Sequence, residues 1–276
     1  MPADLPPELR ANPGALRRGA RRLLPFGLRT ALRRLPAALA HAVAPDPTKT
    51  ADRAPFAHVQ CRRETPLVRE ATPYAAALQA GKETNVRRAA ALVDGALVGP
   101  GASFSWHRHV GPPSAARGFA PGPEIHEGRL VAGLGGGACQ VSNLVYWLAL
   151  HAGMEIVERH RHDLDLFPDH DRTAPFGCGA TVYFPTRDLR FRNPGPEPLL
   201  LELCVEDGAL RGAARFQHDP GVRFEVIERD HRFFREGDAV VRANRLVRRR
   251  LGPYGEVAEE PVAENRARVL YDVPGV

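Results

Sequence analysis

The sequence predicts an α+β fold in which helices precede a mainly antiparallel sheet, with a cysteine-bearing helix packed on that sheet. Two observations predict it. Helical periodicity is confined to the chain before residue 154, and the rest is a series of short β-rich runs separated by turn signals such as Asp207-Gly208. Helices followed by consecutive strands are typical of α+β proteins with an antiparallel sheet.

Length and composition limit the class of protein. The 276 residues are 43% hydrophobic and 25% charged, which excludes a collagen-like, disulfide-dense or wholly disordered chain. No stretch has the roughly 18–20 uncharged apolar residues of a membrane-spanning helix, and no signal peptide is clear. These absences favour a cytoplasmic or membrane-peripheral location. We expect a leader and linker (1–55), a main domain (56–217) and a β-rich extension of the same body (218–276).

Basic charge is concentrated in the leader. The first 44 residues hold eight arginines and two acidic side chains, and the other 232 residues carry equal numbers of basic and acidic side chains. We expect the leader to be partly disordered or amphipathic. It could bind an anionic membrane surface, act as a secretion signal or remain a poorly ordered tail. The neutral body argues against a nucleic-acid partner.

The first helix is predicted over 85–98, where apolar residues recur at helical spacing and a Gly-Pro-Gly stop follows. Residues 103–110 look extended, which would place His107 and His109 on one face of a strand. Residues 111–137 are rich in Gly and Pro and predict a loop.

The most regular helix is predicted from Cys139 to Ala152, with an apolar stripe at i, i+3, i+4, i+7 and i+11 from Val141. Gly153 fits the position that ends it. After this helix we expect strands over 154–162, 179–185, 188–193, 198–206, 209–217, 222–229, 238–249 and 266–273.

Cys139 is the candidate nucleophile. It follows the glycine triplet 135–137 and lies in the first helical turn, where unpaired N–H groups and the helix dipole favour an anion. This position predicts a lowered thiol pKa, and Gly136, Gly137 and the following N–H groups would shape an oxyanion site. The alternative is that Cys139 is a small buried residue at a tight turn.

A base for Cys139 is expected on the strand that follows the helix. If that strand runs back beside the helix, about six residues at ~3.3 Å each return it to the level of Cys139. Either His160 or His162 would then reach the thiol. Asp163, Asp165 or a backbone carbonyl could orient the imidazole.

Three further side chains could contact a substrate. Arg117 could bind a carboxylate with its planar guanidinium, whereas Gln140 and Ser142 could bond a substrate or satisfy the helix start. The four cysteines are far apart and form no CxxC pair, so we expect no metal and no cofactor. A metal site is the alternative, built from Cys139, His160 and His162 with Cys178.

The motifs together resemble the VanW family from about Asn85 to Phe216. The matching segments are GPGxSFSW (99–106), Arg117-Gly118-Phe119, GGGACQVSNLVYWLALHAG (135–153), Glu158-Arg159-His160-x-His162, FPDHDRTAPFGCGATV (167–182) and DLRFRN (188–193). The resemblance implies that the main domain is a VanW domain. Many family members carry an aspartate where this chain has Gly179.

The function implied by the resemblance is cysteine-dependent acyl transfer on peptidoglycan stem peptides, as in L,D-transpeptidases with a VanW domain. A link to cell-wall remodelling or to vancomycin resistance is implied as well. Cys139 matches the family's cysteine and His162 its histidine, so His162 would be the base. The alternative is a non-catalytic accessory module that binds cell-wall precursors or a partner protein.

Overall fold

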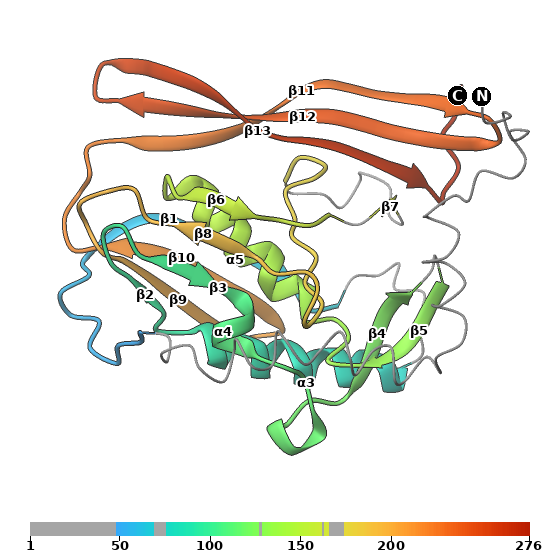
Figure 1. Ribbon diagram of the computed structural model, residues 1–276, viewed down its shortest axis with the longest axis horizontal. Coiled ribbons are helices and arrows are strands. Elements are labelled where there is room, and N and C mark those ends of the chain that lie inside the picture. Colours follow the sequence, from blue (N-terminus) through green and yellow to red (C-terminus); the bar gives the residue numbers. More distant parts are fainter. Residues whose placement is uncertain (1–47, 69–75, 127–128, 162, 166–173) are drawn as a thin grey trace, which may run out of the picture. The chain divides into compact units, whose positions relative to one another are not determined.

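The computed structural model (Figure 1) describes residues 48–68, 76–126, 129–161, 163–165 and 174–276. The chain separates into two units, Met1–Ala44 and Pro45–Val276, and the fold below is that of the second unit. The predictions for the leader fall on residues 1–47, which lie outside the described residues. None of the helices in the described ranges is long and apolar enough to cross a membrane.

A four-stranded antiparallel sheet forms the centre of this unit, in the order β1-β10-β9-β2. Its strands are β1 (His58–Pro66), β2 (Leu97–Val98), β9 (Leu199–Glu206) and β10 (Ala209–Phe216). The predicted turn Asp207-Gly208 joins β9 to β10 with both residues at positive φ, 49° and 73°. Such φ values suit a two-residue hairpin turn, so this part of the prediction is confirmed.

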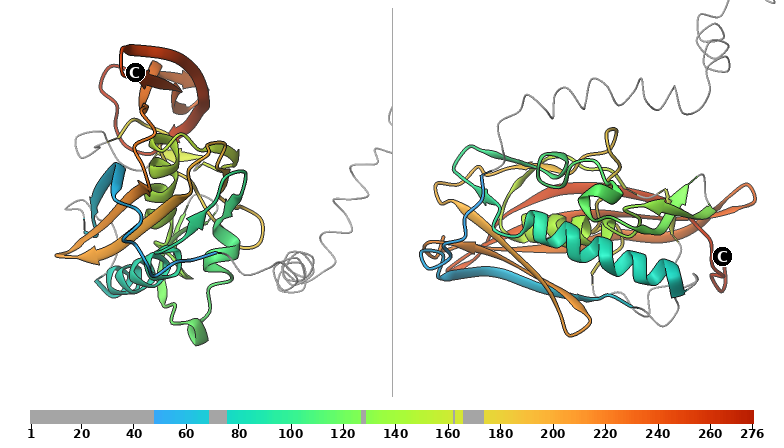
Figure 2. Two further views of the ribbon diagram at one scale, coloured as in Figure 1. Left: turned by 90° about the vertical axis from the view of Figure 1, so that its left-hand side faces the viewer. Right: turned by 90° about the horizontal axis from the view of Figure 1, so that it is seen from below.

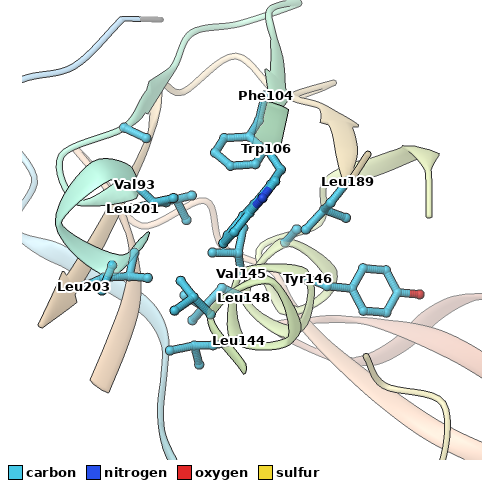
Figure 3. Close-up of a cluster of buried hydrophobic side chains, with 14 of the residues drawn as sticks. Val93, Phe104, Trp106, Leu144, Val145, Tyr146, Leu148, Leu189, Leu201 and Leu203 are labelled. Atoms are coloured by element: carbon cyan, nitrogen blue, oxygen red, sulfur yellow. The ribbon is translucent and has the colours of Figure 1, made fainter. Parts of the chain in front are cut away.

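Two helices, α3 (Ala76–Val93) and α5 (Cys139–His151), share one hydrophobic core with the central sheet. Leu144 and Leu148 of α5 face Gly212 of β10, where an added Cβ would lie 2.8 Å and 3.0 Å from their methyl groups. In the core (Figure 3), Val93 of α3 and Leu201 of β9 gather beside α5. The absence of a side chain at Gly212 therefore lets α5 approach the sheet closely.

The second sheet holds the segments around the candidate site. It is three-stranded, in the order β3-β8-β6, with β3 (Ser103–Ser105), β6 (Glu155–Glu158) and β8 (Arg190–Arg192). The short helices α4 (Trp106–Val110) and η2 (Ala115–Arg117) follow β3. A separate hairpin, β4 (Pro121–His126) and β5 (Arg129–Leu134), lies against α3 and leads directly into α5.

The last part of the chain forms a meander of long strands, β11 (Arg223–Glu236), β12 (Ala239–Gly252) and β13 (Gly255–Val269). The short β7 (Leu164–Asp165) adds a parallel edge to β13. Seen from below (Figure 2, right), α3 lies nearest to the viewer and these strands lie behind it. Helix α5 contacts β10 of the central sheet and β11 of the C-terminal meander, so it lies between these two sheets.

The mainly antiparallel sheet is confirmed, but the prediction that helices precede the strands is wrong, because β1 precedes α3 and four further strands precede α5. Several elements also differ from the prediction. Helix α3 begins earlier, at Ala76, and ends before Gly95 at φ 78° instead of at the Gly-Pro-Gly stop. Residues 106–110 are helical and not extended. Residues 121–126 and 129–134 pair as antiparallel strands instead of forming a loop. Within 179–185 the only β contact is a bridge from Tyr183 to Arg187.

Candidate functional site

The site begins at the glycine loop that leads into α5. Gly135 and Gly137 have φ of 84° and 87°, which side chains other than glycine rarely adopt. Gly136 passes so close to the hairpin that an added Cβ would lie 2.3 Å from the carbonyl oxygen of Gly122. The loop therefore needs glycine at all three positions to turn close to β4 and to place Cys139 at the start of α5.

The side chain of Asn85 stabilises this loop through hydrogen bonds. Its side chain is fully buried on α3, and its Nδ2 donates to the carbonyls of Ala120 (2.9 Å) and Gly136 (2.8 Å). Its Oδ1 accepts from the N–H of Ala120 at 2.8 Å. One amide side chain thus joins α3, the base of the hairpin and the glycine loop, and leaves none of its buried polar atoms without a partner.

The backbone bonds of the loop restrict the oxyanion site that the sequence predicts. The N–H groups of Gly136, Ala138 and Gln140 donate to the carbonyls of Gly133, Gly135 and Gly137. The N–H of Gly136 is therefore engaged within the loop, and the role of Gly136 in shaping the oxyanion site stays a prediction. Gly137 and Cys139 have N–H groups that donate to no backbone carbonyl of the described residues, so they are the candidates for this role.

The thiol of Cys139 is part-buried, and its Sγ donates to the carbonyl of Val182 at 3.8 Å. Burial raises the pKa of the thiol, and the hydrogen bond with the backbone of Val182 opposes this rise without cancelling it. The negative charge of Glu124 adds to the rise, and the positive charge of Arg187 acts against it. The predicted lowering of the thiol pKa is therefore wrong. The cost of burying a thiolate outweighs the favourable position at the helix start, so the resting side chain is a neutral thiol.

His160 follows β6 and pairs with Glu158, the last residue of that strand. Its Nε2 lies 2.9 Å from Oε1 of Glu158, and the two side chains are 36% and 34% exposed. Because a carboxylate only accepts, Nε2 carries the proton and Nδ1 is the basic nitrogen of the neutral ring. The N–H of Asp188 also donates to Oε1 of Glu158, at 3.1 Å. Burial favours the protonated form of Glu158, but these two bonds outweigh it and hold the pKa of the carboxyl below its ordinary value.

One short segment joins the thiol to this pair. Thr181 donates its N–H to the carbonyl of His160 at 2.9 Å, and the next residue, Val182, accepts from Cys139. Within the described residues no hydrogen bond joins the thiol directly to the His160 imidazole. His162, the other predicted base, lies outside the described residues, so its role stays a prediction.

An open depression of about 330 Å³ adjoins His160. It is lined by Arg159, His160, Arg161, Asp163, Arg187 and Glu264. Two of these arginines are bound within the fold. Arg159 donates to the carbonyls of Gly177 and Gly179 and to Oδ1 of Asn265, and Arg161 donates to the carbonyl of Glu264.

The three predicted substrate contacts are each bonded within the fold. Arg117 donates to the carbonyl of Pro112 at 2.6 Å and so stabilises its own loop. Gln140 donates to Oγ1 of Thr65 and to the carbonyl of Pro66, which ties α5 to the end of β1. Ser142 is fully buried and donates to the carbonyls of Ala180 (2.6 Å) and Cys139 (3.1 Å).

Of the two aspartates predicted to orient a histidine, only Asp163 lines the depression. Asp165 is buried and pairs with Arg242 at 3.2 Å, with the hydroxyl of Tyr271 donating to it at 3.0 Å. The carboxylate that binds His160 is instead Glu158, which the sequence analysis did not single out. The signal for it was present, because the sequence predicts a strand over 154–162, and residues two apart on a strand lie on the same face.

No group of three or more His, Cys, Asp or Glu side chains that could hold a metal ion occurs among the described residues. All four cysteines are free thiols. Cys178, which the alternative metal site would use, is largely buried, and burial raises its pKa to about 12. A buried neutral thiol is a poor metal ligand, because ligation requires the thiolate.

Gly179 is the position at which many members of the resembled family carry an aspartate. An added Cβ here would lie 2.8 Å from Oδ1 of Asn143, the atom that accepts from the N–H of Ala180. Asn143 on α5 therefore fills the space beside Gly179. The carbonyl of Gly179 is also in use, because it accepts from Arg159 at 2.8 Å.

Comparison with known proteins gives one family model, described as VanW like protein, which matches residues 81–214. The vancomycin B-type resistance protein VanW of Enterococcus faecalis is 25% identical over 198 residues, covering 71% of this chain and 72% of that protein. The uncharacterized protein YoaR of Bacillus subtilis is 32% identical over 129 residues, covering 46% and 40%. No solved structure matches. The matched region contains the glycine loop, Cys139, the His160–Glu158 pair and Arg187.

Proposed function

The chain belongs to the VanW family, and from this membership and the arrangement around Cys139 we propose that it carries out cysteine-dependent acyl transfer on peptidoglycan stem peptides. We propose further that this activity is linked to vancomycin resistance, the process named for its Enterococcus faecalis relative. The observation that carries the proposal is the Thr181–Val182 segment, which is hydrogen bonded to both Cys139 and His160.

The proposed reaction has two steps. Sγ of Cys139 attacks the carbonyl carbon that precedes the terminal D-residue of a donor peptide, so that an S–C bond forms and the amide C–N bond breaks. An imidazole takes the thiol proton and passes it to the leaving amine. An acceptor amine then attacks the thioester, a C–N bond forms, the S–C bond breaks, and the amine's proton returns to Sγ through the imidazole.

Two features support these roles. In His160 the proton on Nε2 is held by Glu158, which leaves Nδ1 able to accept the thiol proton. The N–H groups of Gly137 and Cys139, which donate to no backbone carbonyl of the described residues, would donate to the oxyanion. His162 is the other candidate base, and a pair of variants separates the two.

Because burial raises the pKa of Cys139, the thiol is not ionised at rest, and deprotonation must accompany substrate binding. We therefore expect slow alkylation of Cys139 by iodoacetamide at pH 7, and a rate that rises only above the pKa of an ordinary thiol, roughly 8.5. Mass spectrometry of the labelled peptides measures this rate, with Cys204 as the internal comparison. Rapid alkylation of Cys139 at pH 7 would contradict the burial argument.

The activity is tested by incubating the full chain with a stem tetrapeptide that ends in D-Ala. We expect release of D-Ala and a mass increase equal to the remaining acyl group on the peptide that contains Cys139. Cys139→Ala should abolish both, and the control Cys204→Ala should retain both. Comparison of His160→Gln with His162→Gln then identifies the base. Full D-Ala release by Cys139→Ala would disprove the proposal.

A second candidate function is a non-catalytic module that binds cell-wall precursors. The raised pKa of Cys139 and its bond to Val182 favour it, because they describe an unreactive thiol. This function predicts tight binding of the tetrapeptide, equal for the wild type and Cys139→Ser in isothermal titration, with no release of D-Ala. Turnover by the wild type would exclude it.

A further inference from the structure

The segment from Tyr183 to Arg187 forms a tight turn that follows the thiol contact immediately. Tyr183 and Arg187 bridge each other through two backbone bonds, from the N–H of Tyr183 to the carbonyl of Arg187 (2.9 Å) and from the N–H of Arg187 to the carbonyl of Tyr183 (2.8 Å). Val182, which accepts from the Cys139 thiol, is the residue before this turn. The position of Arg187 relative to the thiol is therefore set by backbone bonds.

Arg187 differs from the other arginines of the depression. The guanidinium groups of Arg159 and Arg161 donate to atoms of the fold, and Arg159 is also stacked on Tyr146 with 5.3 Å from its Cζ to the ring centre. The side chain of Arg187 is exposed and forms neither a hydrogen bond nor an ion pair with any residue in the described part of the chain. Its five donors are thus available to a ligand.

Two observations place the Arg187 guanidinium in the site. Arg187 lines the same depression as His160. Its charge also acts on the Cys139 thiol, so it lies within electrostatic range of the sulfur. A guanidinium that lines the depression beside His160 is suited to a small planar anion, which it binds through two parallel N–H bonds.

We propose that Arg187 binds the terminal carboxylate of the donor peptide and so determines that the peptide must end in a free acid. This proposal rests on the proposed function, in which the scissile carbonyl lies at Cys139 and the leaving residue carries that carboxylate. Arg187 takes the role that the sequence analysis assigned to Arg117, whose guanidinium is bonded to Pro112. Asp163 and Glu264, which also line the depression, disfavour a ligand with several negative charges.

The experiment measures binding in the Cys139→Ala background, where no acyl transfer can occur. Isothermal titration compares the stem tetrapeptide ending in D-Ala with the same peptide ending in the carboxamide. We expect the acid to bind about tenfold more tightly than the amide, the size of a charge-assisted contact. Arg187→Gln should bring the ratio near one, and Arg187→Lys should give an intermediate ratio because the ammonium keeps the charge without the planar fork.

Arg250→Gln is the matched control, because it removes an equally exposed arginine from β12, outside the depression. It should leave the ratio unchanged, and an unchanged unfolding midpoint of Arg187→Gln shows that this variant is folded. An acid-to-amide ratio near one in the Cys139→Ala background, or a ratio that Arg187→Gln does not alter, overturns the proposal. A third outcome is also informative: the acid binds more tightly than the amide because of Arg187, but the wild type releases no D-Ala. This outcome would overturn the acyl-transfer function and would still support carboxylate binding by Arg187.

Discussion

Burial controls the titration of single side chains in and near this site. It raises the pKa of the Cys139 thiol although the residue begins a helix, and it lowers the pKa of His109 on α4 to about 4. Both shifts favour the neutral form, as expected for groups removed from water. His109 is stacked on Phe104 with 4.4 Å between ring centres, and its Nδ1 donates to the carbonyl of Ser105 at 2.8 Å.

The lowered pKa of His109 predicts acid sensitivity. The unfolded chain binds a proton near pH 6.5 and the folded chain only near pH 4, so stability present above pH 6.5 is lost as the pH falls toward 4. The loss attributable to His109 is about 3 kcal/mol. Urea unfolding at pH 7 and pH 4.5 should show a smaller loss for His109→Gln than for the wild type. The exposed His218→Gln is the control, and equal losses in all three proteins would contradict the prediction.

At the scale of elements, α4 shows why part of the local structure could not be predicted. Ser105 accepts from the N–H of Arg108 as an N-cap, but the N–H of His107 is bonded to Asp188, 81 positions along the chain. The helix therefore depends on a carboxylate that lies on another element. The spacing of His107 and His109 in the sequence is equally typical of a strand.

Only part of the candidate site, too, could be predicted from the sequence. The helix at Cys139 was predictable because its apolar stripe and its ending glycine are local signals. The burial that raises the pKa of the thiol was not predictable, because the surroundings of the thiol include residues far along the chain, such as Val182, 43 positions away. Arg187 carries no local signal at all. Its importance emerges only when Arg159 and Arg161 are seen to be bonded elsewhere.

The glycine loop gives a prediction at this scale. In Gly136→Ala the new methyl group would lie 2.3 Å from the carbonyl oxygen of Gly122, a backbone atom that can move only with the hairpin. We expect a loss of about 1–3 kcal/mol in the free energy of unfolding, the usual cost of overpacking, and reduced peptide binding. Gly99→Ala is the control, since nothing lies within 4 Å of its added Cβ. Equal stability of the two variants in urea would refute the close approach.

At the scale of the whole second unit, the C-terminal strands are joined to α5 through one buried arginine. Arg248 of β12 donates to the carbonyls of Leu150 (3.2 Å) and Met154 (2.7 Å) at the end of α5. Its Cζ lies 5.2 Å from the ring centre of Phe224, which itself packs over Gly153. A cation at a helix C-terminus also complements the helix dipole. The helix that begins with Cys139 is therefore fixed at its far end by the last sheet.

Arg248→Leu tests this connection. The substitution removes a buried donor from the carbonyls of Leu150 and Met154, so we expect a loss of about 1–3 kcal/mol in stability. Amide hydrogen exchange should show weakened protection at the C-terminal end of α5 and at β12. Arg250→Leu on the same strand is exposed and should alter neither quantity. Unchanged protection in Arg248→Leu would show that the two sheets hold together without it.

The pairing of β1 with β10 has a consequence for synthesis of the chain on the ribosome. His58 lies opposite Phe216, so β1 emerges roughly 150 residues before its partner exists. At about 5–20 residues per second, that interval is on the order of 10 s. During this time the strand exposes an unpaired edge, which invites association with other chains. Its charged run Arg62-Arg63-Glu64 is the kind of composition that discourages such association, so these residues protect the nascent chain as well as the finished sheet.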